Sequence, residues 1–163
     1  MNQYTFNRHF PLTRLRRLRV SDNIRDMVSE THLKPCHLIA PVFVLDGKDR
    51  REAIHSMPNV ERLSIDLLIE HVKELYNVGV KTLDIFPVID PNLKTADGKE
   101  AYNTNTLACQ AVSALKDALP DMTVMTDVAL DPYTTHGQDG IIDDAGYVVN
   151  DITTEALIKQ TLA

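Results

Sequence analysis

Residues 64–88, SIDLLIEHVKELYNVGVKTLDIFPV, hold one helix followed at once by one strand. Ser64 is a favourable N-cap residue, and the apolar residues after it recur at the three- and four-residue spacing of a helix that packs by one face. Gly79 is placed to end this helix at the C′ position. The apolar segment 82–88 begins a few residues later and has the length of a strand. The stretch therefore predicts a helix that leads through a short turn into a buried strand.

The same alternation of helix and strand runs through the rest of the chain. The other expected elements are a short helix capped by Ser21, strands over 37–45 and 122–130, a helix over 107–119, a hairpin over 140–149 and a helix that begins near Thr153. Segment 46–63 is expected to be a long polar loop. Short helix-to-strand turns and long strand-to-helix loops indicate an α/β fold with parallel strands joined by right-handed crossovers. In such folds the active site lies at the C-terminal ends of the strands.

The last expected helix places Leu157, Ile158, Thr161 and Leu162 on its inner side. The sequence ends at Ala163, inside this helix, without a C-cap and without a following strand for the apolar face to cover. We therefore expect the chain to be the first part of a longer fold.

Composition and charge exclude several classes of protein. A chain of 163 residues, 44% of them hydrophobic and 25% charged, can form one domain with a real core. The net charge of −6 argues against a nucleic-acid-binding protein. No apolar run approaches the roughly 20 residues of a membrane-spanning helix, and residues 1–6 lack the features of a signal peptide, so we expect a cytoplasmic protein with no membrane partner. Cys36 and Cys109 have no pairing or ligand spacing, which favours two free thiols.

Residues 1–20 differ from the rest of the chain because they are basic. The arginines in this segment are Arg8, Arg14, Arg16, Arg17 and Arg19, and they alternate with Leu12, Leu15 and Leu18. A basic arm on an acidic body can contact nucleic acid or pack on a neighbouring subunit. The regularly spaced leucines favour contact with protein.

The stretch that carries the chemistry is 126–140, TDVALDPYTTHGQDG. Asp127 and Asp131 stand at even spacing at the end of the third expected strand, so both carboxylates can project to one side. The loop that follows contains two glycines and folds Asp139 back towards them. Three such carboxylates can hold a hard cation or position a substrate amine. The alternative is structural: Asp131 starts an Asx turn, and Asp139 begins the hairpin.

This stretch resembles the metal-switch motif of porphobilinogen synthases (5-aminolevulinate dehydratases). Zinc-dependent members of that family carry three cysteines at the positions held here by Ala129, Asp131 and Asp139. Other stretches resemble the family in the same order along the chain: TRLRR (13–17), LIAPVFV (38–44), SMP (56–58), RLS (62–64), FPV (86–88) and GYVVND (146–151). The similarity therefore covers essentially the whole chain.

The resemblance implies the N-terminal portion of a TIM (β/α)8 barrel, truncated after about three to four βα units. Residues 1–20 would be an extended arm that grips a neighbouring subunit, usually in a homo-octamer, and residues 21–163 the first, incomplete part of the barrel. The implied activity is that of a hydro-lyase of tetrapyrrole and heme biosynthesis. It condenses two molecules of 5-aminolevulinate to porphobilinogen with loss of two waters.

The resemblance also implies roles for the acidic residues. Asp127 matches a supporting active-site aspartate, while Asp131 and Asp139 belong to the substrate pocket and are candidate metal ligands. Oxygen ligands in place of thiolates remove the zinc cysteine site and favour magnesium, either at this pair or at an allosteric site with ligands outside this chain. The two lysines that form Schiff bases lie on later strands of the family fold. None of the eight lysines here stands in a family lysine motif, so we expect the isolated chain to be inactive.

Two other functions fit parts of the sequence. The chain can be a non-catalytic fragment that acts only through subunit association, because its arm and its unpaired sheet edges favour binding to protein. It can also be another (β/α) enzyme with magnesium bound by Asp127, Asp131 and Asp139, although it has no glycine loop that would cradle a phosphate.

Overall fold

A computed structural model describes residues 9–163, which divide into two compact units between Lys34 and Pro35. The first unit contains a 3-10 turn, η1 (Arg17–Arg19), and the helix α1 (Asp22–Met27). The Oγ atom of Ser21 accepts a hydrogen bond from the backbone N–H of Ile24 at 3.4 Å, so the helix predicted to begin at this cap is confirmed.

The described part of the basic segment presents apolar side chains to solvent. Leu12, Leu15 and Leu18 are 79%, 81% and 59% exposed within the chain. Residues 1–8 of the expected arm, with Arg8, lie outside the described residues. The boundary of this arm at residue 20 stays a prediction.

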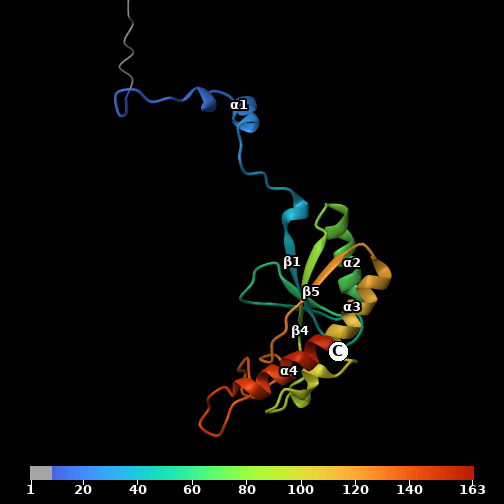
Figure 1. Ribbon diagram of the computed structural model, residues 1–163. Helices are drawn as coiled ribbons and strands as arrows, with labels where there is room; N and C mark the ends of the chain where they lie inside the picture. The colour runs from blue at the N-terminus through green and yellow to red at the C-terminus, as the bar shows by residue number, and fades with distance from the viewer. Residues whose placement is uncertain (1–8) are drawn as a thin grey trace, which may run out of the picture. The chain divides into compact units, whose positions relative to one another are not determined.

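The second unit is a five-stranded mixed sheet in the order β2-β3-β1-β4-β5 (Figure 1). The strands are β1 (Ile39–Val44), β2 (Arg51–Ala53), β3 (Glu61–Leu63), β4 (Thr82–Pro87) and β5 (Thr123–Thr126). The helices are α2 (Ile65–Asn77), α3 (Leu107–Ala118) and α4 (Asn150–Leu162), with 3-10 turns η2 (Pro35–His37), η3 (Pro91–Leu93) and η4 (Lys99–Tyr102). The three strands expected from the sequence, β1, β4 and β5, are parallel and adjacent in chain order. None of the helices within residues 9–163 combines the length and the apolar character that crossing a membrane would need.

The helix α2 ends as its sequence predicts. Gly79 has φ +95° and occupies the C′ position. Its N–H donates to the carbonyl of Tyr76, and the N–H of Val80 donates to the carbonyl of Leu75 at 3.0 Å. This pair of bonds is a Schellman motif, which satisfies the last carbonyls of the helix and turns the chain directly into β4.

The core lies on one face of the sheet, where α2 and α3 pack side by side (Figure 1). Its fully buried members include Leu83 and Ile85 of β4, which alternate with Asp84 and Phe86. Because successive side chains of a strand point to opposite faces, Asp84 and Phe86 lie on the face that α2 and α3 leave uncovered. On that face the ring of Phe86 stacks on the ring of Phe43 at a centroid distance of 5.4 Å.

Three details differ from the sequence predictions. Segment 46–63 is not only a loop, because β2 and β3 form an antiparallel ribbon within it, and β3 pairs with β1. These strands have only three residues each and are largely charged, so no apolar alternation marks them. The third strand ends at Thr126 and does not reach residue 130.

The last helix also begins earlier and packs differently than expected. It starts at Asn150 and buries Thr153 and Ala156, whereas Ile158 and Leu162 are exposed. The hydroxyl of Thr153 accepts a hydrogen bond from the N–H of Ile141 at 3.0 Å, and this bond holds that face of α4 against the preceding loop. The expected hairpin before it is confirmed by an antiparallel bridge, which joins residues 142 and 148.

Candidate functional site

The acidic residues gather at the end of β5 and on the uncovered face of β4. Asp127 is the first residue after β5, and the alternation along that strand places it on the same face as Asp84. Removal from water, reinforced by the negative charge of Asp127, raises the pKa of Asp84. The two carboxyl groups therefore lie within electrostatic reach of one another.

The side chains of Asp131 and Asp139 lie close enough to influence each other's ionisation. Protein atoms around Asp131 take away part of its hydration, which is the largest cause of its raised pKa. The nearby side chain and negative charge of Asp139, and the charge of Asp127, raise the pKa of Asp131 further.

Asp131 is influenced by both Asp139 and Asp127, whereas the convergence of all three carboxylates at one site stays a prediction. Asp131 lies in a turn, and the N–H groups of Tyr133 and Thr134 both donate to the carbonyl of Leu130. It does not continue a strand that starts at Thr123. The turn, and not strand alternation, aims the carboxyl group of Asp131 at Asp139.

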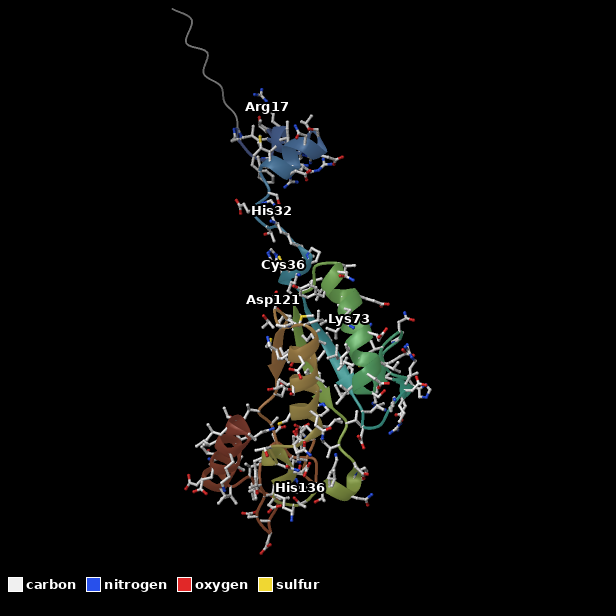
Figure 2. The ribbon with its side chains drawn as sticks, turned by 90° about the vertical axis from the view of Figure 1, so that its right-hand side faces the viewer. Arg17, His32, Cys36, Lys73, Asp121 and His136 are labelled. Carbon is white, nitrogen blue, oxygen red and sulfur yellow. The ribbon has the colours of Figure 1, made fainter. Side chains whose placement is uncertain are left out.

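His136 fastens the loop that carries these residues. Its Nδ1 atom accepts a hydrogen bond from the N–H of Gln138 at 3.2 Å, so its proton lies on Nε2, which donates to the carbonyl of Ala96 at 3.1 Å. Backbone hydrogen bonds of Thr95 to residues 133 and 135 join the same two loops. His136, which is labelled in Figure 2, therefore has a structural role and joins the loop after β5 to the loop after β4.

Tyr133 forms the buried base of the loop. It is 4% exposed and packs in a second core cluster with Leu130, Ile89 and Ala156. Burial is the main cause that raises the pKa of its phenol to about 12, and the nearby Cys109 and Glu100 add to the effect. Tyr133 is therefore a neutral packing residue at physiological pH.

The helix α4 contacts the loop after β5 through the side chain of Gln160. The side-chain amide of Gln160 donates from Nε2 to the carbonyl of Ala129 at 3.1 Å, while its Oε1 atom is buried without a hydrogen-bond partner among the described residues. Sequence reasoning missed Asp84, Tyr133 and Gln160. Asp84 carried a usable signal, because a carboxylate in the middle of an apolar strand is rare.

Several lysines have defined contacts away from these carboxylates. The Nζ atom of Lys116 donates to the carbonyls of Pro120 and Met122, at 2.5 and 2.9 Å. The Nζ atom of Lys81 lies 3.2 Å from the centre of the Tyr76 ring. Lys81 and Lys116 therefore stabilise the fold through these contacts. Within the described part of the chain, no salt bridge reaches the aspartates of the site; the four that form are all made by arginines elsewhere.

Few side chains of the described residues are placed to bind a metal ion. Residues 9–163 contain no group of three or more histidine, cysteine, aspartate or glutamate residues arranged to hold a metal ion. Cys36 and Cys109 are free thiols in different parts of the fold. Asp131 and Asp139 offer two adjacent carboxylates, a donor set that fits magnesium, because magnesium is held by one or two carboxylates and keeps several waters.

Comparison with known proteins identifies the family of this chain. The sequence profile named delta-aminolevulinic acid dehydratase matches residues 12–163. The chain belongs to the delta-aminolevulinic acid dehydratase family. The family member from Bradyrhizobium diazoefficiens is 44% identical over 149 residues, which cover 91% of this chain and 42% of that protein. The member from Bacillus subtilis is 36% identical over 159 residues, which cover 98% of this chain and 46% of that protein.

A solved structure of the family has the same fold over the matched region. It is the delta-aminolevulinic acid dehydratase (porphobilinogen synthase) of Toxoplasma gondii in complex with the reaction product porphobilinogen. The TM-score is 0.88 at 41% identity, and the match covers 92% of this chain and 43% of that one. The chain therefore spans a little over two fifths of the length of these relatives.

The relatives also bear on the compartment. Similar proteins from Chlamydomonas reinhardtii (40% identical, covering 93% of this chain and 39% of that protein) and other species are named as chloroplastic. The cytoplasmic location expected from the sequence stays a prediction.

Proposed function

We propose that this chain forms the opening part of a (β/α)8 barrel and supplies the acidic wall of a porphobilinogen synthase active site. The reaction would be the condensation of two 5-aminolevulinate molecules to porphobilinogen with loss of two waters. One observation supports the proposal: in a chain that belongs to this family, Asp131, in the loop after β5, is influenced by the charges of both Asp127 and Asp139. The C-terminal end of the strands is where (β/α)8 barrels bind their substrates.

In the proposed site these carboxylates receive the ammonium group of 5-aminolevulinate. A cation bound between Asp131 and Asp139 would stabilise both carboxylates in their ionised forms, because its positive charge offsets their mutual repulsion. Asp127, directly after β5, is placed to orient a reacting amine. The lysines that form Schiff bases with the substrate ketones would come from later strands of the family fold.

Magnesium is the metal that we propose for this protein. The oxygen atoms of Asp131 and Asp139 would hold it if it binds in this chain, and it would supply Lewis acidity and charge neutralisation there. The other arrangement is an allosteric magnesium with its main ligand outside this chain. Replacing Asp139 by Asn separates the two, since only the first predicts a weaker magnesium dependence.

Subunit association is the remaining part of the proposal. The exposed leucines of the first unit, Leu12, Leu15 and Leu18, fit an arm that packs on a neighbouring subunit, in a homo-octamer as in the family. A cytoplasmic location belongs to the same proposal.

The proposed function can be tested with a chimeric enzyme built from a full-length member of the family. Residues 12–163 replace the matching segment of the Bradyrhizobium diazoefficiens relative, and pyrrole formation from 5-aminolevulinate is followed with an aldehyde reagent. We expect the chimera to form porphobilinogen, the Asp127→Asn, Asp131→Asn and Asp139→Asn chimeras to lose most of this activity, and the 163-residue chain alone to form none. An inactive but folded chimera would refute the proposed function.

A second function, association without catalysis, is favoured by the exposed leucines alone. Size-exclusion chromatography of this chain mixed with the full-length relative tests it. Co-elution that is lost when Leu12, Leu15 and Leu18 are replaced by Ser is the expected result, and separate elution would contradict it.

A further inference from the structure

Asp84 occupies the middle of β4, the central strand of the parallel part of the sheet. Its register partners are Pro41 on β1 and Met125 on β5. Its sequence neighbours Leu83 and Ile85 are fully buried against the helices, so Asp84 points to the opposite face. That face carries Pro41 and Met125, both exposed within this chain.

The carboxyl group of Asp84 is poorly satisfied. Its Oδ1 atom is buried and has no hydrogen-bond partner among the described residues. A buried carboxylate oxygen without a donor or a cation is costly, because neither water nor protein compensates for its lost hydration. Desolvation raises the pKa of Asp84, as expected for a carboxyl group in this position.

The buried Oδ1 atom of Asp84 therefore does not stabilise the folded chain. Aspartate is disfavoured in strands, and α2 and α3 pack on the face of the sheet opposite to the one towards which Asp84 points. Polar groups that break local rules of folding are concentrated at functional sites. In the barrel of the proposed function, on which this inference rests, the uncovered face is the interior, and the carboxylates of Asp127, Asp131 and Asp139 lie at its rim.

We propose that Asp84 binds a primary ammonium group inside the barrel, beneath the carboxylates of Asp127, Asp131 and Asp139. The ammonium comes either from a lysine side chain of polypeptide facing β4 or from 5-aminolevulinate. The chemistry is the same in both cases: a charge-assisted hydrogen bond from N–H to the buried Oδ1 atom. Such a bond holds an amine at the floor of the pocket while Asp127 contacts it from the strand end.

The first experiment uses the 163-residue chain, in which no salt bridge between the described residues involves Asp84. The Asp84→Asn variant should melt at a higher temperature than the parent at pH 7, because it removes an uncompensated buried carboxylate. The folded-state pKa of Asp84 is raised, so its destabilising effect appears as the pH rises above the ordinary value of 3.8 and should vanish below it. The matched control is Asp121→Asn, a change of an exposed aspartate just before β5 (Figure 2), which should leave the melting temperature unchanged. A lower melting temperature for Asp84→Asn at pH 7 would overturn the proposal.

The second experiment uses the active chimera with the Bradyrhizobium diazoefficiens relative. Loss of one charge-assisted hydrogen bond should lower kcat/KM by about tenfold to a hundredfold in Asp84→Asn. Asp84→Glu should recover part of the activity, and Asp121→Asn should keep all of it. A rise in KM at unchanged kcat identifies the substrate ammonium, whereas a lower kcat with a displaced pH profile identifies a protein lysine.

The two proposals fail in different ways. Full activity of the Asp84→Asn chimera overturns the role of Asp84 and leaves the proposed function standing. An inactive parent chimera refutes the proposed function, while the melting experiment on the chain still tests whether Asp84 is held without a partner. A variant that is both more stable in the chain and less active in the chimera is the expected result, and a purely structural carboxylate cannot produce it.

Discussion

Replacing Leu83 by Ala tests whether the core lies on one face of the sheet only. Leu83 is fully buried in β4, between β1 and β5 and against the helices. The substitution removes three carbon groups, worth about 2.4 kcal/mol of transfer free energy at about 0.8 kcal/mol each. The cavity left behind raises the expected loss of unfolding free energy to about 3–5 kcal/mol.

The assay is urea unfolding followed by circular dichroism. With a slope of about 2 kcal/mol per molar urea, a loss of 3 kcal/mol lowers the midpoint by roughly 1.5 M. Leu83→Ala therefore removes a large part of the stability of a domain of this size. Measurements at two protein concentrations reveal any contribution from self-association.

The matched control is Met125→Ala on the opposite face. Met125 is 43% exposed, so its truncation removes little buried surface and should cost about 1 kcal/mol or less. If Met125→Ala destabilises the chain as much as Leu83→Ala at both concentrations, the second face is buried too. The assignment of that face as an open barrel interior would then be wrong.

Three further predictions follow from single residues. Gly79→Ala should cost about 1–2 kcal/mol in urea unfolding, because an L side chain is strained at the positive φ of this C′ position. Asp139→Asn should lower the pKa of Asp131, measured by carboxyl-carbon NMR, since a charge that opposes ionisation of Asp131 is removed; an unchanged pKa would mean that the two groups do not interact. The phenol of Tyr133 should titrate near pH 12 in ultraviolet absorbance, and because its unfolded value is near 10, stability should fall as the pH rises between these values. A Tyr133→Phe variant should lose that part of the pH dependence.

The fold was predictable from the sequence where the apolar periodicity agrees with residues that typically begin or end a helix or strand. The stretch from Ser64 to Val88 has both, since a helical stripe ends at Gly79 and a strand begins directly afterwards. The ribbon formed by Arg51–Ala53 and Glu61–Leu63 was not predictable in this way. It is made by backbone pairing and by the ion pair between Arg51 and Glu61, neither of which leaves an apolar pattern.

The last helix shows how tertiary packing overrides a local apolar pattern. Ile158 and Leu162 suggested the inner face, yet the structure buries Thr153, because its hydroxyl satisfies the N–H of Ile141. A small residue with a hydrogen-bonding group fits close to the loop, where a large aliphatic side chain would leave that N–H unpaired. The exposed Ile158 and Leu162 instead form an apolar surface on the outside of α4.

Asp127, Asp131 and Asp139 as site residues stay a prediction, whereas the strand position expected for Asp131 was wrong. Asp127, Asp131 and Asp139 do interact, but a turn after a shorter strand brings the last two together. Spacing in the sequence showed which side chains can converge, whereas the turn is held by contacts that are distant in sequence, such as His136 with Ala96. Asp84 was missed for the opposite reason, since it lies within an apolar strand and away from any motif.

The position of Asp84 changes how the acidic wall can work. Carboxylates confined to a loop would hold an amine only at the mouth of the barrel, where water competes for it. Asp84 lies on β4, the neighbour of β5 in the sheet, and its Oδ1 atom is buried. In the proposed barrel it would extend the negative potential of the site into a region of low dielectric, where charge interactions are strongest. The strand β4 is hydrogen-bonded to a strand on each side, whereas the loop after β5 is held by contacts of His136 and Thr95. In the proposed site, Asp84 would therefore set the depth of a bound amine, and the carboxylates of the loop would meet it first. Changes at Asp84 should therefore affect the geometry of the bound amine, and changes at Asp139 should affect its uptake.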